Sequence, residues 1–321
     1  MSRPLRVGLV GARRTRQGLG PFVARDLRAA GAEVVAFVAT RETTCAQAAE
    51  QLQQNAGVRP RPYLETGAML EAETLDALAI CSPHETHADA LELGLNRGLH
   101  TLCEKPLVWG EDAAEKSVRL ARAFADASLV LFENCQWPYT LPAFERLHPG
   151  VLDQPPRRFE MLLEPAGDGA RMLGDSLPHP LSLLQRLAPA DAPRLEAIRC
   201  ESDAPDAPRV RLCFTYVADD VLVESEIKLH QKLTHPRENR LVIDGHAVQR
   251  CVAPDYALAF ADAGRRVKLD DPLTALVADF VGRARDGFDP EAGRRTREIA
   301  ARAALLESLV SAWRLQTAPA R

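Results

Sequence analysis

The sequence predicts an α/β protein with a doubly wound parallel sheet at the N-terminus, followed by an α+β domain with a large open sheet of mixed or antiparallel strands. Short apolar strands alternate with helices up to about residue 132, a pattern typical of parallel sheets with helical crossovers. After residue 150, strands follow one another with few helices between them, which favours antiparallel pairing. Because 321 residues exceed one ordinary core, we expect domains over residues 1–125 and 126–321.

The elements of the first domain follow from apolar runs and helical spacing. The run 33–39, Glu-Val-Val-Ala-Phe-Val-Ala, predicts the second strand. Residues 18–30 carry apolar side chains at helical spacing and end at Gly31. Pro60 and Pro62 are expected to break the segment after the second helix. The expected elements are strands 5–10, 33–39, 76–81, 99–103 and 129–132, and helices 18–30, 43–56, 67–73, 86–97 and 110–126.

The second domain is predicted from short strands between proline-rich joints. A long C-terminal pair of helices is expected as well, because apolar residues recur at helical spacing on both sides of Gly287 and Pro290. The expected elements are strands 157–163, 195–202, 209–217, 221–230, 240–243 and 247–252, and helices 177–187, 272–286 and 291–315.

Composition excludes several classes of protein. A content of 46% hydrophobic and 26% charged residues is typical of a globular protein. The chain has 40 basic and 44 acidic residues and shows no basic stripe that would favour binding of nucleic acid. No apolar run approaches the roughly 20 residues that span a bilayer. The seven scattered cysteines are odd in number and form no Cys-x-x-Cys, which favours a reduced, cytoplasmic setting. His84 and His87 have no third ligand at a credible spacing, so we expect no metal.

A glycine-rich turn follows the first strand, where backbone N–H groups and a helix N-terminus can approach a pyrophosphate. If Gly11 is the first glycine of G-x-G-x-x-G, Arg13 and Arg16 occupy the second and third positions, and Gly18 or Gly20 takes the third role after a longer loop. The pyrophosphate is expected at Gly11, Ala12, Arg13 and Arg14.

The end of the second strand predicts which dinucleotide binds. NAD sites usually place a carboxylate there for the ribose 2′-hydroxyl, whereas an arginine suits the 2′-phosphate of NADP. Thr40 and Arg41 stand at that corner, and Arg13 or Arg14 can reach it. We therefore favour NADP over NAD; the alternative is that these arginines are solvated, with Glu42 as the partner of Arg41.

A lysine after a strand and a carboxylate–imidazole pair stand at positions suited to proton transfer. Glu104-Lys105-Pro106 comes directly after the strand 99–103, and a lysine there points into the crevice where open α/β sheets bind ligands. About seventy residues later, Asp175 and His179 lie four apart, which places them on one helix face only if residue 175 is already helical.

Several motifs together resemble the glucose–fructose oxidoreductase / inositol dehydrogenase / rhizopine catabolism (Gfo/Idh/MocA) oxidoreductase family. In chain order they are Ser82-Pro83-x-x-x-His87, Gly98-x-His100, Glu104-Lys105-Pro106, Gly174-Asp175-x-x-x-His179 and Asp271-Pro272-Leu273. The resemblance implies a Rossmann-type N-terminal domain and NAD(P)-dependent hydride transfer at a carbon bearing oxygen, often on a sugar or cyclitol. It also implies a homodimer or homotetramer, and the alternating apolar residues of 221–229 suit an exposed sheet face for that contact.

The resemblance implies a role for individual residues. Lys105 would orient the substrate hydroxyl or shuttle its proton, His179 would be the general acid/base, and Asp175 would orient or assist it. Ser82, Pro83 and His87 are expected at the cofactor crevice, and Glu104 either holds the cofactor or stabilises its own turn.

Departures from the family pattern leave the substrate open. Leu177 replaces the usual glycine, Ser182 stands where an aspartate is common, and an arginine often found near residue 136 is absent. Gln136, Trp137 and Tyr139 are expected substrate contacts, with core packing as the alternative for the two aromatics. Imine reduction, redox-assisted glycoside cleavage and non-catalytic nucleotide sensing therefore remain alternatives to oxidation of a hydroxyl group.

Overall fold

The computed structural model describes residues 3–13, 18–202, 204–253 and 257–317. The chain forms two compact units: unit 1 comprises Met1–Asn134 and Leu273–Ile299, and unit 2 comprises Cys135–Pro272 and Ala300–Arg321. A division into separately folding domains after residue 125 stays a prediction. No helix in the described ranges combines the length and the apolar character needed to cross a membrane.

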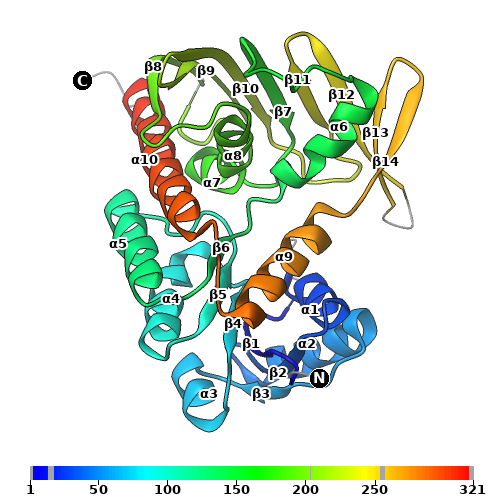
Figure 1. The fold of residues 1–321 in the computed structure, drawn as a ribbon, viewed down its shortest axis with the longest axis vertical. Coiled ribbons are helices and arrows are strands. Elements are labelled where there is room, and N and C mark those ends of the chain that lie inside the picture. The colour runs from blue at the N-terminus through cyan, green and yellow to red at the C-terminus, as the bar shows by residue number, and fades with distance from the viewer. Residues whose placement is uncertain (1–2, 14–17, 203, 254–256, 318–321) are drawn as a thin grey trace. The chain divides into compact units, whose positions relative to one another are not determined.

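Unit 1 contains a six-stranded sheet in the order β3-β2-β1-β4-β5-β6, and every neighbouring pair is parallel (Figure 1). Its crossovers on either side of β1 run in opposite directions along the sheet, which makes it doubly wound and confirms the predicted fold class. The strands are β1 (Arg6–Val10), β2 (Glu33–Val38), β3 (Arg61–Tyr63), β4 (Ala77–Ile80), β5 (His100–Cys103) and β6 (Leu131–Glu133).

Helices join these strands, and buried apolar residues of both make up the core. All four residues of β4 are buried, as its uninterrupted apolar run requires in a sheet covered on both faces. The helical elements of unit 1 are α1 (Gly20–Ala29), α2 (Glu42–Ala56), α3 (Thr66–Ala72), η1 (His84–Thr86), α4 (His87–Asn96), α5 (Ala113–Asp126), most of α9 (Pro272–Asp286) and the first turns of α10 (Ala292–Thr317).

The expected break at Pro60 and Pro62 is wrong, because Arg61–Tyr63 forms the strand β3. This strand lies at the edge of the sheet and pairs with β2 alone. A proline is tolerated on an edge strand, where its missing N–H faces no neighbour.

Unit 2 contains an eight-stranded sheet in the order β14-β13-β12-β11-β7-β10-β9-β8. All its pairs are antiparallel except the pair of β7 with β10, so the sheet is mixed, as predicted. The strands are β7 (Arg158–Leu163), β8 (Arg194–Glu201), β9 (Arg209–Ala218), β10 (Val221–His230), β11 (Asn239–Ile243), β12 (His246–Val252), β13 (Leu258–Asp262) and β14 (Arg265–Leu269).

Helices of unit 2 lie on one face of this sheet (Figure 1). They are η2 (Trp137–Thr140), α6 (Leu141–Leu147), α7 (Gly169–Ser176), α8 (Pro178–Leu187) and the later turns of α10. In β10 the apolar residues Val223, Ile227 and Leu229 are fully buried. The opposite face of the strand is polar, with an ion pair of 2.8 Å between Lys228 and Glu226. The expected exposed apolar face is therefore wrong, apart from the 59% exposed Leu222.

The elements of unit 2 that were not predicted include α6 and the hairpin of β13 and β14. The hairpin turns at Ala263 and Gly264, both with positive φ, as a two-residue turn between antiparallel strands requires. The helix α7 was also missed, because only the segment after residue 177 was assigned as helix.

Candidate functional site

The turn after β1 is a tight one that only glycine fits. Gly11 has a φ of +84°, and a Cβ on it would lie 2.3 Å from the backbone nitrogen of Ser82. Any side chain here would collide with the backbone that follows β4. The carboxyl ends of β1 and β4 are therefore held in direct backbone contact by this glycine.

Gly20, the first residue of α1, packs against the glycine turn. A Cβ on Gly20 would lie 2.5 Å from the carbonyl oxygen of Gly11 and 2.9 Å from the carbonyl carbon of Ala12. The N-terminus of α1 thus packs directly on the turn, as dinucleotide sites require. The sequence left Gly18 and Gly20 open for the third position, and this contact is the one expected of Gly20 in that position.

Arginines lie at the corner between β2 and α2. Arg13 donates from Nη1 to Oε1 of Gln47 on α2, at 2.9 Å. Arg41 is the N-cap residue of α2, and Thr44 bonds to its backbone N–H at 3.0 Å. Arg41 and Thr40 are exposed, and Arg41 forms no ion pair with any residue in the described ranges, Glu42 included. Arg14 lies outside the described residues.

The loop after β4 is tied to the loop after β5 by His87. Its Nδ1 lies 2.9 Å from the carbonyl oxygen of Pro106, and its Nε2 lies 2.9 Å from that of Ser82. Burial lowers the pKa of His87, whereas the two carbonyls and Glu104 favour its charged form. The ring is 1% exposed, so any influence of His87 on a cofactor runs through the two loops that it joins.

The loop after β5 carries Glu104 and Lys105 directly behind the buried strand. Asn134, at the end of β6, donates from Nδ2 to Oε1 of Glu104 at 2.5 Å. Burial raises the pKa of the Glu104 carboxyl, opposed by Lys105 and by the bond from Asn134. Lys105 is half-buried, and its peptide bond to Pro106 is cis. The part of Asn134 was missed from the sequence, although a polar residue directly behind a buried strand was the signal.

These three loops lie at the carboxyl edge of one parallel sheet. In the strand order of unit 1, the chain leaves β1 in one direction toward β2 and in the other toward β4. Open α/β sheets bind ligands at such a switch point, in the crevice outside the strand ends. The contact of Gly11 with Ser82 lies at this point, and Glu104 and Lys105 follow on the next strand.

In unit 2, Asp175 and His179 belong to two consecutive helices. Asp175 is helical in α7, and His179 is in the first turn of α8. The helical backbone continues through the junction. The N–H of Leu177 donates to the carbonyl of Leu173, and the carbonyl of Leu177 accepts from the N–H of Leu181. Both residues are half-buried between fully buried neighbours, so the condition for a shared helix face is met.

Trp137 is the centre of a small cluster in unit 2. Its ring centroid lies 6.4 Å from that of His179, and Cζ of Arg250 lies 5.5 Å above its ring. Trp137 is 3% exposed, while Gln136 and Tyr139 are half-buried. Arg250 was missed from the sequence, where its only signal is a charged residue inside an otherwise weakly polar strand.

The predicted residues thus form two groups. The described residues of the predicted cofactor set lie in unit 1 with Lys105, whereas Asp175, His179, Gln136, Trp137 and Tyr139 lie in unit 2. In the described ranges, no three His, Cys, Asp or Glu side chains are arranged to hold a metal ion.

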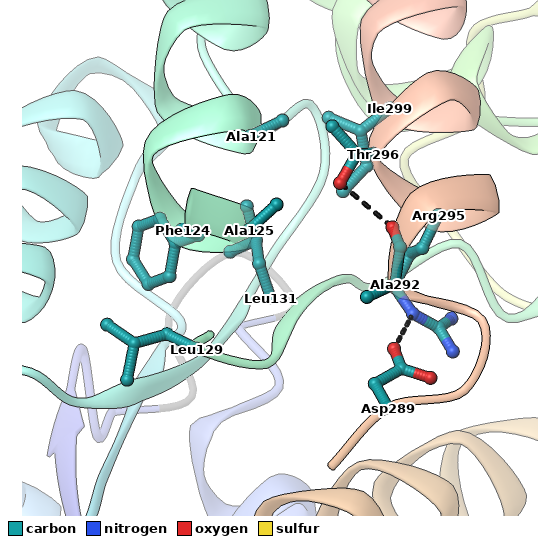
Figure 2. Close-up of a pocket in the computed structure, with 10 residues that line it drawn as sticks. All are labelled: Ala121, Phe124, Ala125, Leu129, Leu131, Asp289, Ala292, Arg295, Thr296 and Ile299. Carbon is teal, nitrogen blue, oxygen red and sulfur yellow. Dashed lines mark hydrogen bonds and ion pairs between the residues drawn. The ribbon is translucent and has the colours of Figure 1, made fainter. Parts of the chain in front are cut away.

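A small pocket in unit 1 lies between α5, β6 and the start of α10 (Figure 2). Its volume of about 10 Å³ admits a single water molecule. Asp289 and Arg295 at its rim are joined by a bond of 3.0 Å, and the guanidinium of Arg295 stacks 3.7 Å from the ring centroid of Phe132. This pocket belongs to the core and is too small for a substrate.

Comparisons with known proteins agree with this geometry. Residues 5–134 match the model of the GFO_IDH_MocA family, an oxidoreductase family with an NAD-binding Rossmann fold. A segment of 104 residues is 32% identical to D-xylose 1-dehydrogenase (NADP(+)) 2 of Haloferax volcanii and covers 32% of this chain and 26% of that protein. A segment of 120 residues is 32% identical to inositol 2-dehydrogenase of Corynebacterium glutamicum and covers 37% of this chain and 34% of that protein.

The fold likeness extends over the whole chain. The crystal structure of myo-inositol 2-dehydrogenase from Lactobacillus plantarum matches with a TM-score of 0.71 and 17% identity, covering 98% of each chain. At this identity the match shows the fold, and the aligned segments span only 26% and 34% of the two curated relatives. The family model, by contrast, covers the sheet that bears the glycine turn and the Glu104-Lys105-Pro106 loop. Residues 5–134 therefore belong to the GFO_IDH_MocA oxidoreductase family, the family that the sequence motifs resemble.

Proposed function

We propose that the protein is an NAD(P)-dependent oxidoreductase that transfers hydride between nicotinamide and a hydroxyl or carbonyl carbon of a small polar molecule, sugar-like or cyclitol-like. One observation carries the proposal. The glycine turn, Ser82 and the Glu104-Lys105 loop follow one another along the carboxyl edge of a parallel sheet, starting at its switch point. The two curated relatives, both named as dehydrogenases of polyhydroxylated molecules, support the same class of substrate.

The residues of unit 1 fit a dinucleotide. Gly11 and Gly20 make the backbone contacts that a side chain would prevent, and these contacts bring the N-terminus of α1 to the turn. That N-terminus and the turn would hold the pyrophosphate, because free backbone N–H groups and the helix dipole favour anions. When bound, nicotinamide supplies the hydride acceptor or donor of the reaction.

We propose that NADP is preferred. Arg41 and Arg13 lie around the first turns of α2, and a guanidinium binds phosphate with two parallel hydrogen bonds. Thr40 has a short, uncharged side chain, so it does not repel a phosphate group. The name of the Haloferax volcanii relative, which includes NADP(+), is in keeping with this preference.

The chain supplies the proton chemistry. Oxidation of an alcohol releases the hydroxyl proton, and reduction of a ketone consumes one. We propose that Lys105 binds the substrate oxygen and that His179 accepts or returns the proton, since histidine is the side chain most often used for this task. Asp175, on the same helix face, orients the ring of His179.

A screen of neutral sugars and inositols with NADP⁺ and NAD⁺, and of the matching ketones with NADPH and NADH, tests the activity. Lys105→Met is expected to lower kcat at least about a hundredfold while the Kd for the cofactor changes less than about threefold. The matched control is Lys116→Met on α5. Its exposed amine donates to the carbonyl of Glu111 at 3.0 Å, and its loss should leave kcat unchanged.

A double variant tests whether Lys105 and His179 serve the same reaction. If they act as a unit, Lys105→Met combined with His179→Asn costs little more in kcat than either change alone. Fully additive losses would assign the two residues to separate steps. Turnover by Lys105→Met at the wild-type rate would contradict the role of Lys105, and cofactor binding without turnover of any carbonyl or hydroxyl compound would favour a nucleotide sensor.

We also propose that the protein forms a homodimer or homotetramer through the open face of the unit 2 sheet. This face carries ion pairs such as Lys228 with Glu226, at 2.8 Å. An interface built on them weakens with salt. Light scattering at low and high ionic strength should show larger assemblies at low salt, and a monomer at both would contradict the proposal.

A further inference from the structure

Arg250 stands on the helix-covered face of the unit 2 sheet, among apolar neighbours. Residues 246, 248 and 250 alternate on this face of β12, where His246 meets the ring of His148 and Val248 is buried. Phe260, directly opposite Arg250 on β13, is fully buried. The guanidinium itself lies over the ring of Trp137, at 5.5 Å.

Among the described residues, no carboxylate forms an ion pair with this guanidinium. Its Nε is buried and donates no hydrogen bond to any described residue. Asp271 acts on it only at longer range, and burial lowers the pKa of Arg250. Arginine nevertheless stays protonated in proteins, so a positive charge is kept here at a cost.

Trp137 lies beside both Arg250 and His179, the residue proposed as the general acid/base. Trp137 lies 6.4 Å from the ring of His179 and 5.5 Å from the guanidinium of Arg250. Both groups therefore lie beside the same aromatic ring. A ligand that placed its reacting carbon at His179 would bring a neighbouring substituent toward Arg250.

We propose that Arg250 binds an anionic group of the substrate, a carboxylate or a phosphate, and that the protein acts on a charged sugar derivative in preference to a neutral one. The inference rests on the proposed function, since it takes the molecule bound beside His179 to be the substrate. A planar guanidinium matches the two oxygens of a carboxylate or phosphate and gains most where water is excluded. Binding such a group would also supply a charge partner that none of the described residues supplies.

Binding by isothermal titration, with and without NADP⁺, tests the inference without turnover. The probes are D-glucose, D-glucuronate, D-glucose 6-phosphate and UDP-glucose, which separate a carboxylate from a phosphate and a pyrophosphate on the same sugar. We expect at least one anionic probe to bind at least tenfold more tightly than D-glucose. In Arg250→Met the Kd of the same probe is expected to lie within threefold of the Kd of D-glucose. The Kd of D-glucose itself should stay unchanged.

Arg240→Met is the matched control, because Arg240 is exposed on the neighbouring strand β11 and pairs with Gln249, on the opposite face from Arg250. It is expected to keep the full preference. If Arg250→Met fails to fold, judged by circular dichroism, Arg250→Lys carries the test. Lysine keeps the positive charge but cannot form two parallel hydrogen bonds. The ratio of affinities for the anionic probe and for D-glucose should therefore fall at least fivefold.

The inference is overturned if no anionic probe binds, if D-glucose binds as tightly as all three, or if the preference survives in Arg250→Met. Its failure is distinct from failure of the proposed function. The latter shows as an absence of hydride transfer with any sugar, charged or neutral, whereas a neutral sugar oxidised well beside weakly bound anions would refute the inference alone.

Discussion

Replacing Gly20 by alanine probes the contact on which the dinucleotide site depends. A Cβ at this position would lie 2.5 Å from the carbonyl oxygen of Gly11, whereas ordinary contact begins at 3.4 Å. The atoms that it meets belong to the backbone of the turn, so no side-chain rotation relieves the overlap. Either α1 or the glycine turn must therefore move by nearly the missing distance.

The size of the effect follows from two opposing contributions. Overpacking of this kind costs about 1–3 kcal/mol. Alanine recovers up to about 1 kcal/mol of helix propensity, and less at the first helical position than in a helix interior. A net loss of about 1–2 kcal/mol in the free energy of unfolding should lower Tm by about 2–8 °C. Displacing the turn should weaken NADPH binding at least about tenfold, or 1.4 kcal/mol.

Gly282→Ala is the matched control, because Gly282 lies inside α9 of the same unit and a Cβ there would meet nothing within 4 Å. This variant should be more stable than wild type by up to about 1 kcal/mol and should bind NADPH normally. Differential scanning calorimetry and a fluorescence titration measure both quantities. If Gly20→Ala matched Gly282→Ala in Tm and in affinity, the role given to Gly20 would be refuted.

Two further predictions concern charges in unit 1. Arg41→Ala should weaken NADPH at least about tenfold and NADH less than about threefold, with exposed Arg59→Ala as control; equal losses for both cofactors would remove the phosphate contact. Asp289→Asn should cost about 2–4 kcal/mol at pH 7, because the 4% exposed side chain of Asp289 bonds Arg283 at 2.7 Å and Arg295 at 3.0 Å. Burial raises the pKa of Asp289, but the two arginines and a backbone N–H bond leave it lowered overall, so the stabilisation is complete above the ordinary value near 3.9 and is lost as pH falls through the folded pKa. Urea unfolding from pH 7 to pH 3 should show the gap between wild type and variant closing, and a gap that does not depend on pH would contradict this account.

The parallel sheet was predictable because most of its strands are short runs of apolar residues. The residues of β4 and β5 are nearly all buried, so no polar alternation obscures them, and helices separate them at regular intervals. The Glu104-Lys105-Pro106 loop was predictable for the same reason, since it follows directly on such a strand. The register of Asp175 and His179 depended on one local condition, the helical state of Asp175, which the structure meets.

What the sequence did not predict depends on contacts between distant segments. The third glycine could not be assigned by spacing, because the turn is longer than the usual motif; the contact of Gly20 with Gly11 reveals it. Strand β3 was not predicted, because a strand accommodates Pro62 only at the edge of the sheet, and the sequence does not show where the edge lies. The return of Leu273–Ile299 to unit 1 and the position of Arg250 over Trp137 join residues more than a hundred positions apart, which local patterns cannot show.

The most direct test of the account is a titration of the purified protein with NADPH and with NADH, followed by nicotinamide fluorescence. We predict saturable binding of NADPH, at least about tenfold tighter than that of NADH, as the glycine turn and Arg41 require. Binding of neither cofactor would contradict the central claim, because a turn that holds no pyrophosphate leaves Lys105 without a hydride partner.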